Sequence, residues 1–258
     1  MRNFSRCSSP SHPGPEAQPQ GQSLCVSNLR LRYALPGQRF LQVLQVPSLC
    51  IPASLAVAIT GPSGSGKTSL LHTLCGLVSP DTGTVQWEAV DITLLPESAR
   101  DRWRRQTVGL IFQDFHLFLG MSALQNVLVP ASFAYFRVPH WLRHRANDLL
   151  ACVGVHNGQA PVAKMSRGEM QRVAVARALL FSPPIVLADE PTASLDAETG
   201  ALVHTMLLEM CRAARSTLIM VTHDAALARH ADVCYRLRQG DLVQYAPGEG
   251  RLGGDATL

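Results

Sequence analysis

The sequence lacks the features by which a chain crosses a membrane or is cross-linked into a small domain. None of its apolar stretches reaches the roughly 18 uninterrupted residues that a membrane-spanning helix needs. Its seven cysteines form no C-x-x-C pair and are odd in number, which argues against a zinc site and against a disulfide framework. We therefore do not expect this chain to span a membrane by itself.

Charge is also scarce, because only 16% of the residues are Asp, Glu, Lys or Arg and the net charge is +4. Much of the positive excess lies in residues 100–105. Nucleic-acid binding would use such a run, with Trp103 stacking on a base. One short basic run is more often the exposed face of a helix, so we predict a polar helix before a strand at 108–112, and no nucleic-acid partner.

The N-terminal segment 1–23 is rich in Pro, Ser, Gln and Gly and lacks the apolar core of a secretory signal. We expect it to be a disordered tail, and residues 246–258 to be a flexible C-terminal tail. The remaining residues, 24–245, are long enough for one large α/β domain with an inserted subdomain.

The most informative segment fits the pattern G-x-x-x-x-G-K-[ST] at every fixed position. Small residues let consecutive backbone N–H groups surround an anion, and the helix that follows adds the positive end of its dipole. The lysine should reach the β- and γ-phosphates, and the threonine hydroxyl should ligate Mg2+. The predicted ATP-binding residues of this loop are Gly61, Pro62, Ser63, Gly64, Ser65, Gly66, Lys67 and Thr68.

Apolar strands and helices alternate along the chain around this loop. Residues 57–60, 185–188 and 218–221 read as strands buried on both faces, with a helix at 202–212. This order predicts an α/β fold, a P-loop NTPase core with a mainly parallel sheet that binds ligands at the carboxyl ends of its strands.

Two further regions complete the predicted fold. Residues 24–33 and 40–47 read as strands joined by a turn at 35–38, which suggests an antiparallel β flank. Residues 114–165 look mostly helical, most clearly at 141–153, and we interpret them as an inserted helical subdomain.

Polar side chains follow the predicted parallel strands. Asp189 and Glu190 end the strand at 185–188, where two acids would be costly to bury without a positive partner. We expect Asp189 to be a Mg2+ partner and Glu190 to be the catalytic base that orients or deprotonates the attacking water. His223 should either touch the γ-phosphate or hold Glu190, and Gln113 should either ligate Mg2+ or sense the γ-phosphate.

A second candidate anion site is a predicted helix N-terminus that begins with Ser166, Arg167, Gly168 and Glu169. The S-x-x-E pattern is a capping box, and capping alone would explain Ser166 and Glu169. A capped N-terminus with Gly168 in its first turn also suits a phosphate. Two such helix ends in one chain suggest that each serves a different end of the nucleotide, with a second subunit as one way to achieve this.

Together these residues resemble the nucleotide-binding subunit of an ATP-binding cassette (ABC) transporter over residues 24–245. The motifs occur in the family's order, namely the Walker A loop at 61–68, the Q-loop at Gln113, the signature at 165–171, Walker B at 185–190, the D-loop at 194–196 and the switch His223. The resemblance implies that Tyr33 stacks on adenine, and that Ser69 and Asp196 also belong to the nucleotide site.

The resemblance further implies an ATPase that works with partners. Two copies would sandwich two ATP molecules, and the helical subdomain would pass the motion to a membrane permease at the cytoplasmic face of the inner (plasma) membrane. Residues 111–117 and 123–127 look like the branch of lipoprotein-releasing, macrolide-exporting (MacB-like) and cell-division (FtsE-like) cassettes. This branch favours export or extraction of a substrate.

Two residues depart from the family's signature L-S-G-G-[QE]. Met165 replaces the leucine, a mild change, and Arg167 stands where the first glycine belongs. Arg167 would either crowd the opposing nucleotide or point sideways. Because Glu190 and His223 are in place, we expect hydrolysis to survive.

Two other functions share these motifs. A regulatory cassette of the cell-division type would transmit force through a membrane protein without moving a solute. A soluble ATPase acting on DNA or ribosomes would fit less well, because the chain has no long coiled coil and no second cassette. The transported substance is not encoded here, since selectivity lies in the membrane subunit.

Overall fold

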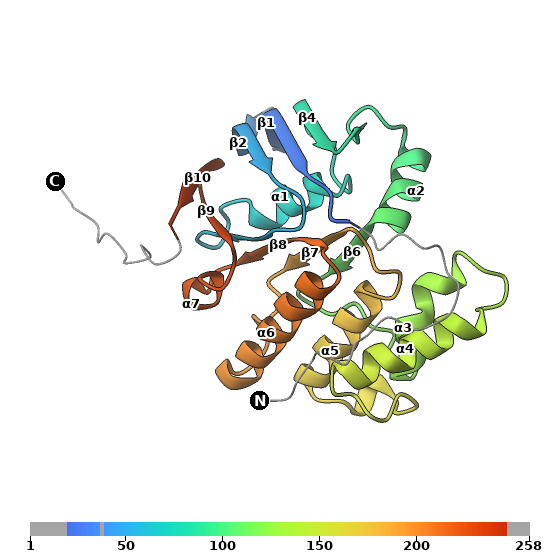
Figure 1. The fold of residues 1–258 in the computed structure, drawn as a ribbon. Coiled ribbons are helices and arrows are strands. Elements are labelled where there is room, and N and C mark those ends of the chain that lie inside the picture. Colours follow the sequence, from blue (N-terminus) through green and yellow to red (C-terminus); the bar gives the residue numbers. More distant parts are fainter. Residues whose placement is uncertain (1–19, 37–38, 247–258) are drawn as a thin grey trace.

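The computed structural model describes residues 20–36 and 39–246 (Figure 1). Most of the two predicted tails lies outside these residues. The backbone N–H of Gly21 donates to the Arg215 carbonyl at 2.8 Å, and that of Ser23 donates to the Glu88 carboxylate at 2.6 Å. The chain is therefore already hydrogen-bonded to the domain at Gly21, three residues before the boundary predicted at residue 24.

A six-stranded sheet forms the centre of the molecule (Figure 1). All neighbouring pairs in it are parallel except the pair at one edge, which is antiparallel. The strands of the predicted parallel core are fully buried, as their continuous apolar runs indicated. In spatial order the strands are β10 (Asp241–Tyr245), β9 (Val233–Arg238), β3 (Ala56–Thr60), β8 (Thr217–Thr222), β7 (Ile185–Asp189) and β6 (Val108–Ile111).

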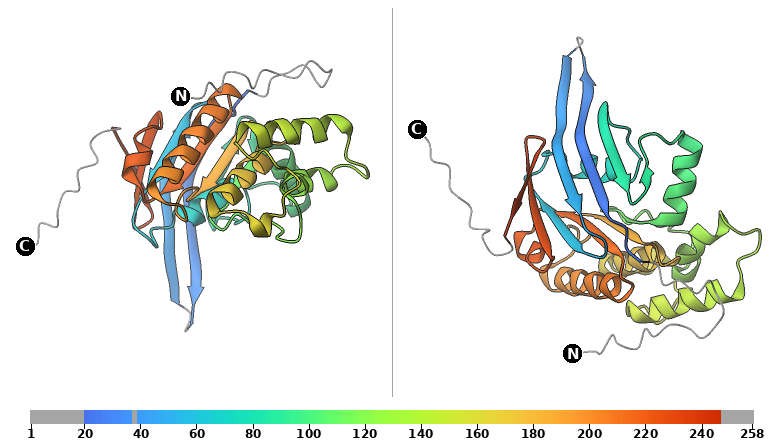
Figure 2. Two further views of the ribbon diagram at one scale, coloured as in Figure 1. Left: turned by 90° about the horizontal axis from the view of Figure 1, so that it is seen from below. Right: turned by 45° about the horizontal axis from the view of Figure 1, so that its top comes forward.

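A second, antiparallel sheet stands beside the first, as predicted for the flank. Its two longest strands form a hairpin that projects from the molecule (Figure 2). Gly37 and Gln38 of the predicted turn lie outside the described residues. The strands in order are β2 (Arg39–Ile51), β1 (Leu24–Leu35), β4 (Thr82–Trp87) and β5 (Val90–Asp91).

The two faces of the six-stranded sheet face two separate apolar cores. Val57 and Ile59 of β3 face the antiparallel sheet and helix α1 (Lys67–Leu74), which lies between the sheets. Ala56 and Ala58, which alternate with them, face the opposite core. That second core is covered by the helices of the inserted subdomain and by α6 (Ala197–Ala213).

The helical subdomain predicted at residues 114–165 is present. It contains α3 (Ala123–Ser132), α4 (His140–Cys152) and a short 3-10 helix at Val162–Lys164, and α5 (Arg167–Ala178) packs against it. The helix expected at 141–153 is α4, whose buried face carries Leu142, Ala146, Leu149 and Leu150.

Four elements near the C-terminal end differ from the prediction. Helix α6 begins at Ala197, well before residue 202, because the Asp196 carboxylate accepts a hydrogen bond from the Thr199 N–H at 2.9 Å and caps the helix. Strands β9 and β10 and the short helix α7 (Ala225–Ala228) were not predicted. Every residue of β10 is exposed or half-buried, so its pattern carries little signal.

The basic run 100–105 forms part of helix α2 (Glu97–Thr107), which leads directly into β6 as predicted. Trp103 packs against the core between the sheets. Arg104 pairs with Asp101 and donates to the Cys75 carbonyl at 3.1 Å. Trp103 is therefore half-buried, with part of its side chain packed against this core.

Within residues 20–36 and 39–246, no helix is both long and apolar enough to cross a bilayer. Cys25, Cys50, Cys75, Cys211 and Cys234 carry free thiols, and Cys152 is disulfide-bonded.

Candidate functional site

The phosphate loop joins the buried strand β3 to helix α1, in the predicted context. Gly64 and Gly66 have φ angles of 78° and 97°, in the left-handed region that favours glycine. A Cβ on Gly66 would lie 2.8 Å from the Val43 carbonyl oxygen of β2, and a Cβ on Gly61 would clash with the Leu237 carbonyl oxygen of β9. The loop is therefore pressed between both sheets and needs glycine at these positions.

Lys67 lies at the start of α1 with its side chain only 8% exposed. Its ammonium group donates to the carbonyl oxygens of Gly61 at 2.9 Å and Pro62 at 3.1 Å, and lies 3.7 Å from Glu190 Oε1. A phosphate oxygen is a stronger acceptor than a neutral carbonyl. The ammonium group is thus placed inside the loop and can exchange these hydrogen bonds for bonds to a phosphate.

Asp189 ends β7 and is only 5% exposed. Burial raises the pKa of its carboxyl group, and a hydrogen bond from the Thr68 hydroxyl to Oδ1, 3.2 Å long, acts in the opposite direction. A carboxylate and a hydroxyl are oxygen ligands of the kind that Mg2+ prefers, and a divalent cation would compensate the buried charge. The residues present therefore fit a magnesium site.

Glu190 follows Asp189 and is held by several partners. Its Oε2 lies 2.7 Å from Nδ1 of His223 and accepts a hydrogen bond from the His223 backbone N–H at 3.3 Å. The φ of Glu190 is 45°, a left-handed conformation that a side chain rarely adopts and that tends to occur at functional sites. Of the two alternatives for His223, this geometry shows the one in which it holds Glu190.

Gln113 and Tyr33 lie at the edges of this group. Ile111 pairs with Ala188, so Gln113, which is exposed, follows β6 at the same sheet edge at which Asp189 ends β7. Tyr33 on β1 is 43% exposed, and its hydroxyl lies 3.5 Å from the Ser69 hydroxyl on α1. The ring is thus placed beside the first turn of the helix that follows the phosphate loop.

The signature segment forms the predicted capping box. The Glu169 N–H donates to Ser166 Oγ at 3.3 Å, and the Ser166 N–H donates to the Glu169 carboxylate at 2.9 Å. Hydrogen bonds that the Ser166 N–H and hydroxyl donate to the carboxylate hold the pKa of Glu169 below its usual value. A Cβ on Gly168 would lie 2.6 Å from Thr199 Cγ2, so α5 packs against the start of α6 at this glycine.

Arg167 points sideways along the surface. Its guanidinium carbon lies 5.6 Å from the centroid of the Phe115 ring, within range of a cation–π interaction. Phe115 is 7% exposed, and its carbonyl accepts a hydrogen bond from Arg177 of α5 at 2.6 Å. These partners could not be recognised in the sequence, because only the folded chain brings residue 115 next to α5.

The structure assembles one group of predicted residues and separates another. Lys67, Thr68, Asp189, Glu190 and His223 meet at the carboxyl ends of β3, β7 and β8. The capped starts of α5 and α6 form a second group, which holds Ser166, Gly168, Glu169 and Asp196. Among the described residues no hydrogen bond joins the second group to the phosphate loop, so the chain presents two half-sites.

The site has a glycine-rich loop between a buried strand and a helix. A buried aspartate and a histidine-bound glutamate lie beside this loop. This arrangement defines a P-loop nucleotide-hydrolysing domain. The model of the ABC transporter family matches residues 44–193. The chain belongs to the ABC transporter family, as an ATP-binding cassette that hydrolyses ATP.

Curated relatives are close enough to support this assignment over most of the chain. A lipoprotein-releasing system ATP-binding protein, LolD 2 of Rhodopirellula baltica, is 42% identical over 206 residues, which covers 78% of this chain and 80% of the relative. LolD 1 of the same organism is 40% identical over 231 residues, 89% of this chain and 98% of the relative. LolD of Treponema pallidum is 40% identical over 205 residues, which covers 79% of this chain and 90% of the relative.

Solved structures confirm the fold. A dimeric post-hydrolysis state of the ATP-binding cassette MJ0796, bound to ADP and Pi, superposes with a TM-score of 0.79 at 31% identity, covering 87% of this chain and 98% of that chain. The structure of cbiO1 of Clostridium perfringens, part of the ABC transporter complex cbiONQ, superposes with a TM-score of 0.75 at 26% identity, covering 87% of this chain and 88% of that chain. The predicted family, fold class and ATPase activity are thereby confirmed.

Proposed function

We propose that this chain is the ATP-hydrolysing subunit of a transporter that extracts lipoproteins from a membrane through a separate permease. Three curated relatives at 40–42% identity are lipoprotein-releasing system ATP-binding proteins. ATP hydrolysis supplies the free energy, and its mechanism is the same whichever substrate the permease moves.

In the proposed mechanism the phosphate loop binds the triphosphate. Lys67 transfers its hydrogen bonds from Gly61 and Pro62 to the β- and γ-phosphates. Thr68 and Asp189 hold Mg2+, with Gln113 as a further ligand or sensor from β6. When bound, the metal ion supplies charge neutralisation for the phosphate oxygens.

Glu190 acts as the base, or orients the attacking water. The observation that carries this role is its position between Lys67 and His223, with one carboxylate oxygen facing each. Binding of the phosphates to Lys67 frees Oε1 for water, while His223 keeps Oε2 in place. In this scheme His223 is a positioning residue, because it acts through Glu190.

The second half-site completes a nucleotide in another copy of the chain. The capped N-terminus of α5 offers Ser166 and Gly168 to the phosphates, and Asp196 at the start of α6 lies beside it. Two solved structures of the cassette MJ0796 are dimeric, which supports a sandwich of two copies. Tyr33 and Ser69 would contact the nucleotide from the copy that holds its phosphates.

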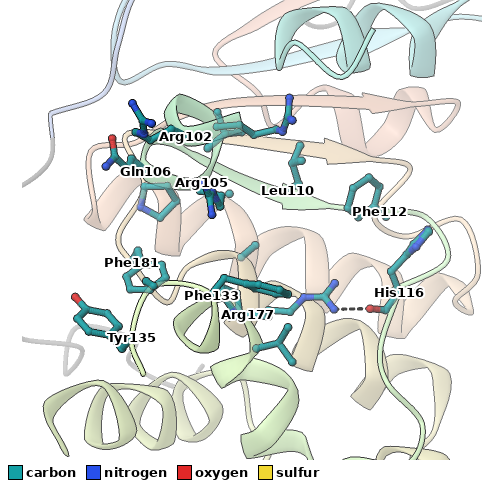
Figure 3. Close-up of a pocket in the computed structure, with 18 residues that line it drawn as sticks. Arg102, Arg105, Gln106, Leu110, Phe112, His116, Phe133, Tyr135, Arg177 and Phe181 are labelled. Carbon is teal, nitrogen blue, oxygen red and sulfur yellow. Dashed lines mark hydrogen bonds between the residues drawn. The ribbon is translucent and has the colours of Figure 1, made fainter. Parts of the chain in front are cut away.

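A cleft between the sheet core and the helical subdomain is the proposed contact with the permease (Figure 3). Its volume is about 830 Å³, with Arg102 and Arg105 of α2 on the core side and Phe133 and Tyr135, which follow α3, on the side of the helical subdomain. Phe112 and His116, on either side of the segment that holds Gln113, line one end. The cleft is lined mainly by α2, β6, α3 and α5, with Arg102, Arg105, Arg177, Phe133, Tyr135 and Phe181 among its residues.

The chemistry of this cleft indicates what would bind. Phe133 is 71% exposed and Tyr135 is 39% exposed, and both line the cleft together with Arg102 and Arg105, which leaves apolar surface close to positive charge. An amphipathic cytoplasmic segment with acidic residues complements both. Such a partner would hold the cassette at the cytoplasmic face of the inner membrane.

The test is to purify the Glu190→Gln variant from detergent-solubilised membranes with ATP and Mg2+ and to identify the bound protein. We expect a permease with a large extracytoplasmic domain, and ATP turnover of the wild-type complex stimulated by an acylated lipoprotein. The matched variant Arg105→Glu should lose the permease but keep ATP binding. Stimulation by a different substrate, or by none, would contradict the lipoprotein assignment while leaving the ATPase intact.

A further inference from the structure

Cys25 and Cys50 form a pair of exposed thiols on the hairpin of β1 and β2. They are direct register partners across the two antiparallel strands, and their Sγ atoms lie 3.2 Å apart. Their chain neighbours Leu24, Val26, Leu49 and Ile51 are all buried. Both thiols therefore project from the outer face of the antiparallel sheet.

The backbone around this pair already suits a covalent bond. Directly opposite residues of antiparallel strands have Cα atoms about 4.5 or 5.5 Å apart, and disulfides span Cα distances of about 4.4–6.8 Å. Closure therefore requires rotation of two side chains and no change of strand register. We infer that Cys25 and Cys50 form a thiol–disulfide exchange site whose reactant is a small-molecule disulfide of the glutathione class.

The exchange proceeds in two balanced steps. One thiol of the pair, as thiolate, attacks a sulfur of the small disulfide, forms a mixed disulfide and releases one small thiolate, which takes up the proton. The second thiol, again as thiolate, attacks the protein sulfur of the mixed disulfide, and the Cys25–Cys50 bond forms as the second small thiol leaves. Two protein thiols are oxidised and one small disulfide is reduced to two thiols.

The remaining free thiols within the described residues are poor competitors. Cys75, Cys211 and Cys234 are buried. Burial raises the pKa of Cys75 to about 11 and that of Cys211 to about 12, so little thiolate forms there. The hydrogen bond with Cys50 also raises the pKa of Cys25, so accessibility and proximity, rather than an activated thiolate, select this pair.

The bond would close across the strands that carry Tyr33 without displacing them. These strands are already paired from Leu24 and Ile51 up to Leu35 and Arg39. Oxidation should therefore leave ATP binding unchanged and cross-link the two strands of the hairpin covalently. The inference does not depend on which substrate the permease moves.

The experiment incubates the folded, full-length chain with oxidised glutathione, blocks the remaining thiols and maps the linkages by peptide mass spectrometry. We expect a peptide pair joined by Cys25 and Cys50 as the first new linkage, reversible by reduced glutathione. The buried cysteines should be labelled only after unfolding.

Two serine variants distinguish the reaction of two neighbouring thiols from the reaction of single exposed thiols. In Cys25→Ser and in Cys50→Ser the remaining thiol should accumulate as a stable mixed disulfide, because no neighbouring thiol can resolve it. Phenylarsine oxide, which bridges two close thiols with loss of water, should bind the wild-type pair and neither variant. The inference is overturned if the wild-type chain accumulates mixed disulfides at both positions, or if either serine variant keeps the arsenical at the remaining thiol.

Discussion

Glu190 combines a strained backbone with a fixed carboxylate. A left-handed residue with a side chain costs roughly 1–2 kcal/mol, and here the Val221 carbonyl and His223 hold it in place. Glu190→Gln keeps the shape of the side chain but removes its basicity. We expect turnover to fall by about 10²–10⁴ with ATP affinity unchanged.

Steady-state ATPase assays and equilibrium binding of a fluorescent ATP analogue measure these two effects separately. His223→Ala serves as the comparison, because it leaves the carboxylate in place and should lower turnover less. Equal turnover in wild type and Glu190→Gln would remove Glu190 from the mechanism.

Asp189 gives a pH-dependent prediction for the nucleotide-free protein. Its pKa is raised by burial, so the folded state binds the proton more tightly than the unfolded state does. Stability from this group is present at low pH and is lost as pH rises through the raised pKa. Asp189→Asn should therefore raise the melting temperature of the apoprotein at neutral pH.

The stabilisation by Asp189→Asn should shrink as pH falls below the raised pKa. Melting curves of both proteins across the acidic range, without Mg2+ or nucleotide, measure the difference. A difference that grows toward low pH would contradict the sign of the shift. Added Mg2+ and ATP should stabilise the wild type more than the variant.

Residue-level prediction from the sequence worked best where chemistry dictates residue type. The phosphate loop requires glycine in left-handed conformations, and acids at a buried strand end require a cation, so Gly66 and Asp189 were recognisable. The partners of Arg167 could not be recognised from the sequence. Its contact with Phe115 depends on how α5 meets the segment after β6, which no local pattern encodes.

At the scale of elements, two helices begin with the same capping box. Ser166 with Glu169 caps α5, and Ser122 with Gln125 caps α3. Loss of either serine hydroxyl should destabilise the fold by about 1 kcal/mol. Only Ser166→Ala should also weaken ATP-driven dimerisation, because only α5 is proposed to face a phosphate.

Denaturant unfolding measures the first effect, and size-exclusion chromatography with ATP in a Glu190→Gln background measures the second. Ser122→Ala is the matched control, since it removes the same local hydrogen bond elsewhere. Equal dimerisation of both variants would make Ser166 a cap and nothing more.

The contact of Arg167 joins α5 to the segment that follows Gln113. A cation–π contact at an exposed site is worth about 0.5–1 kcal/mol, so its loss should barely change stability. Because Arg167 points away along Phe115, we expect Arg167→Gly to hydrolyse ATP at least as fast as wild type. Turnover assays test this, and a tenfold loss in the variant would show that the guanidinium takes part directly.

Element boundaries were predictable where apolar periodicity was strong and were missed where polar residues set them. Helix α4 and the buried strands follow their hydrophobic patterns. Helix α6 extends back to Asp196 because of one side-chain hydrogen bond, which hydrophobicity does not report. Asp196 therefore caps a helix in the chain as it stands, and its role toward nucleotide remains a proposal.

For the whole molecule, the separation of the two half-sites predicts ATP-dependent association. Because hydrolysis is blocked in Glu190→Gln, saturating ATP and Mg2+ should convert the variant from monomer to dimer, while ADP should not. Light scattering after chromatography measures the mass. A monomer that persists with ATP, also with its permease present, would contradict the proposed sandwich.

The contact between Val43 and Gly66 has a consequence for attempts at miniaturisation. The backbone of β2 forms one wall of the phosphate cradle, although β2 belongs to the outer sheet. A shortened cassette that kept every motif but omitted the N-terminal hairpin would leave that cradle open on one side. Reduced versions of this ATPase should therefore retain β1 and β2 as part of the catalytic unit.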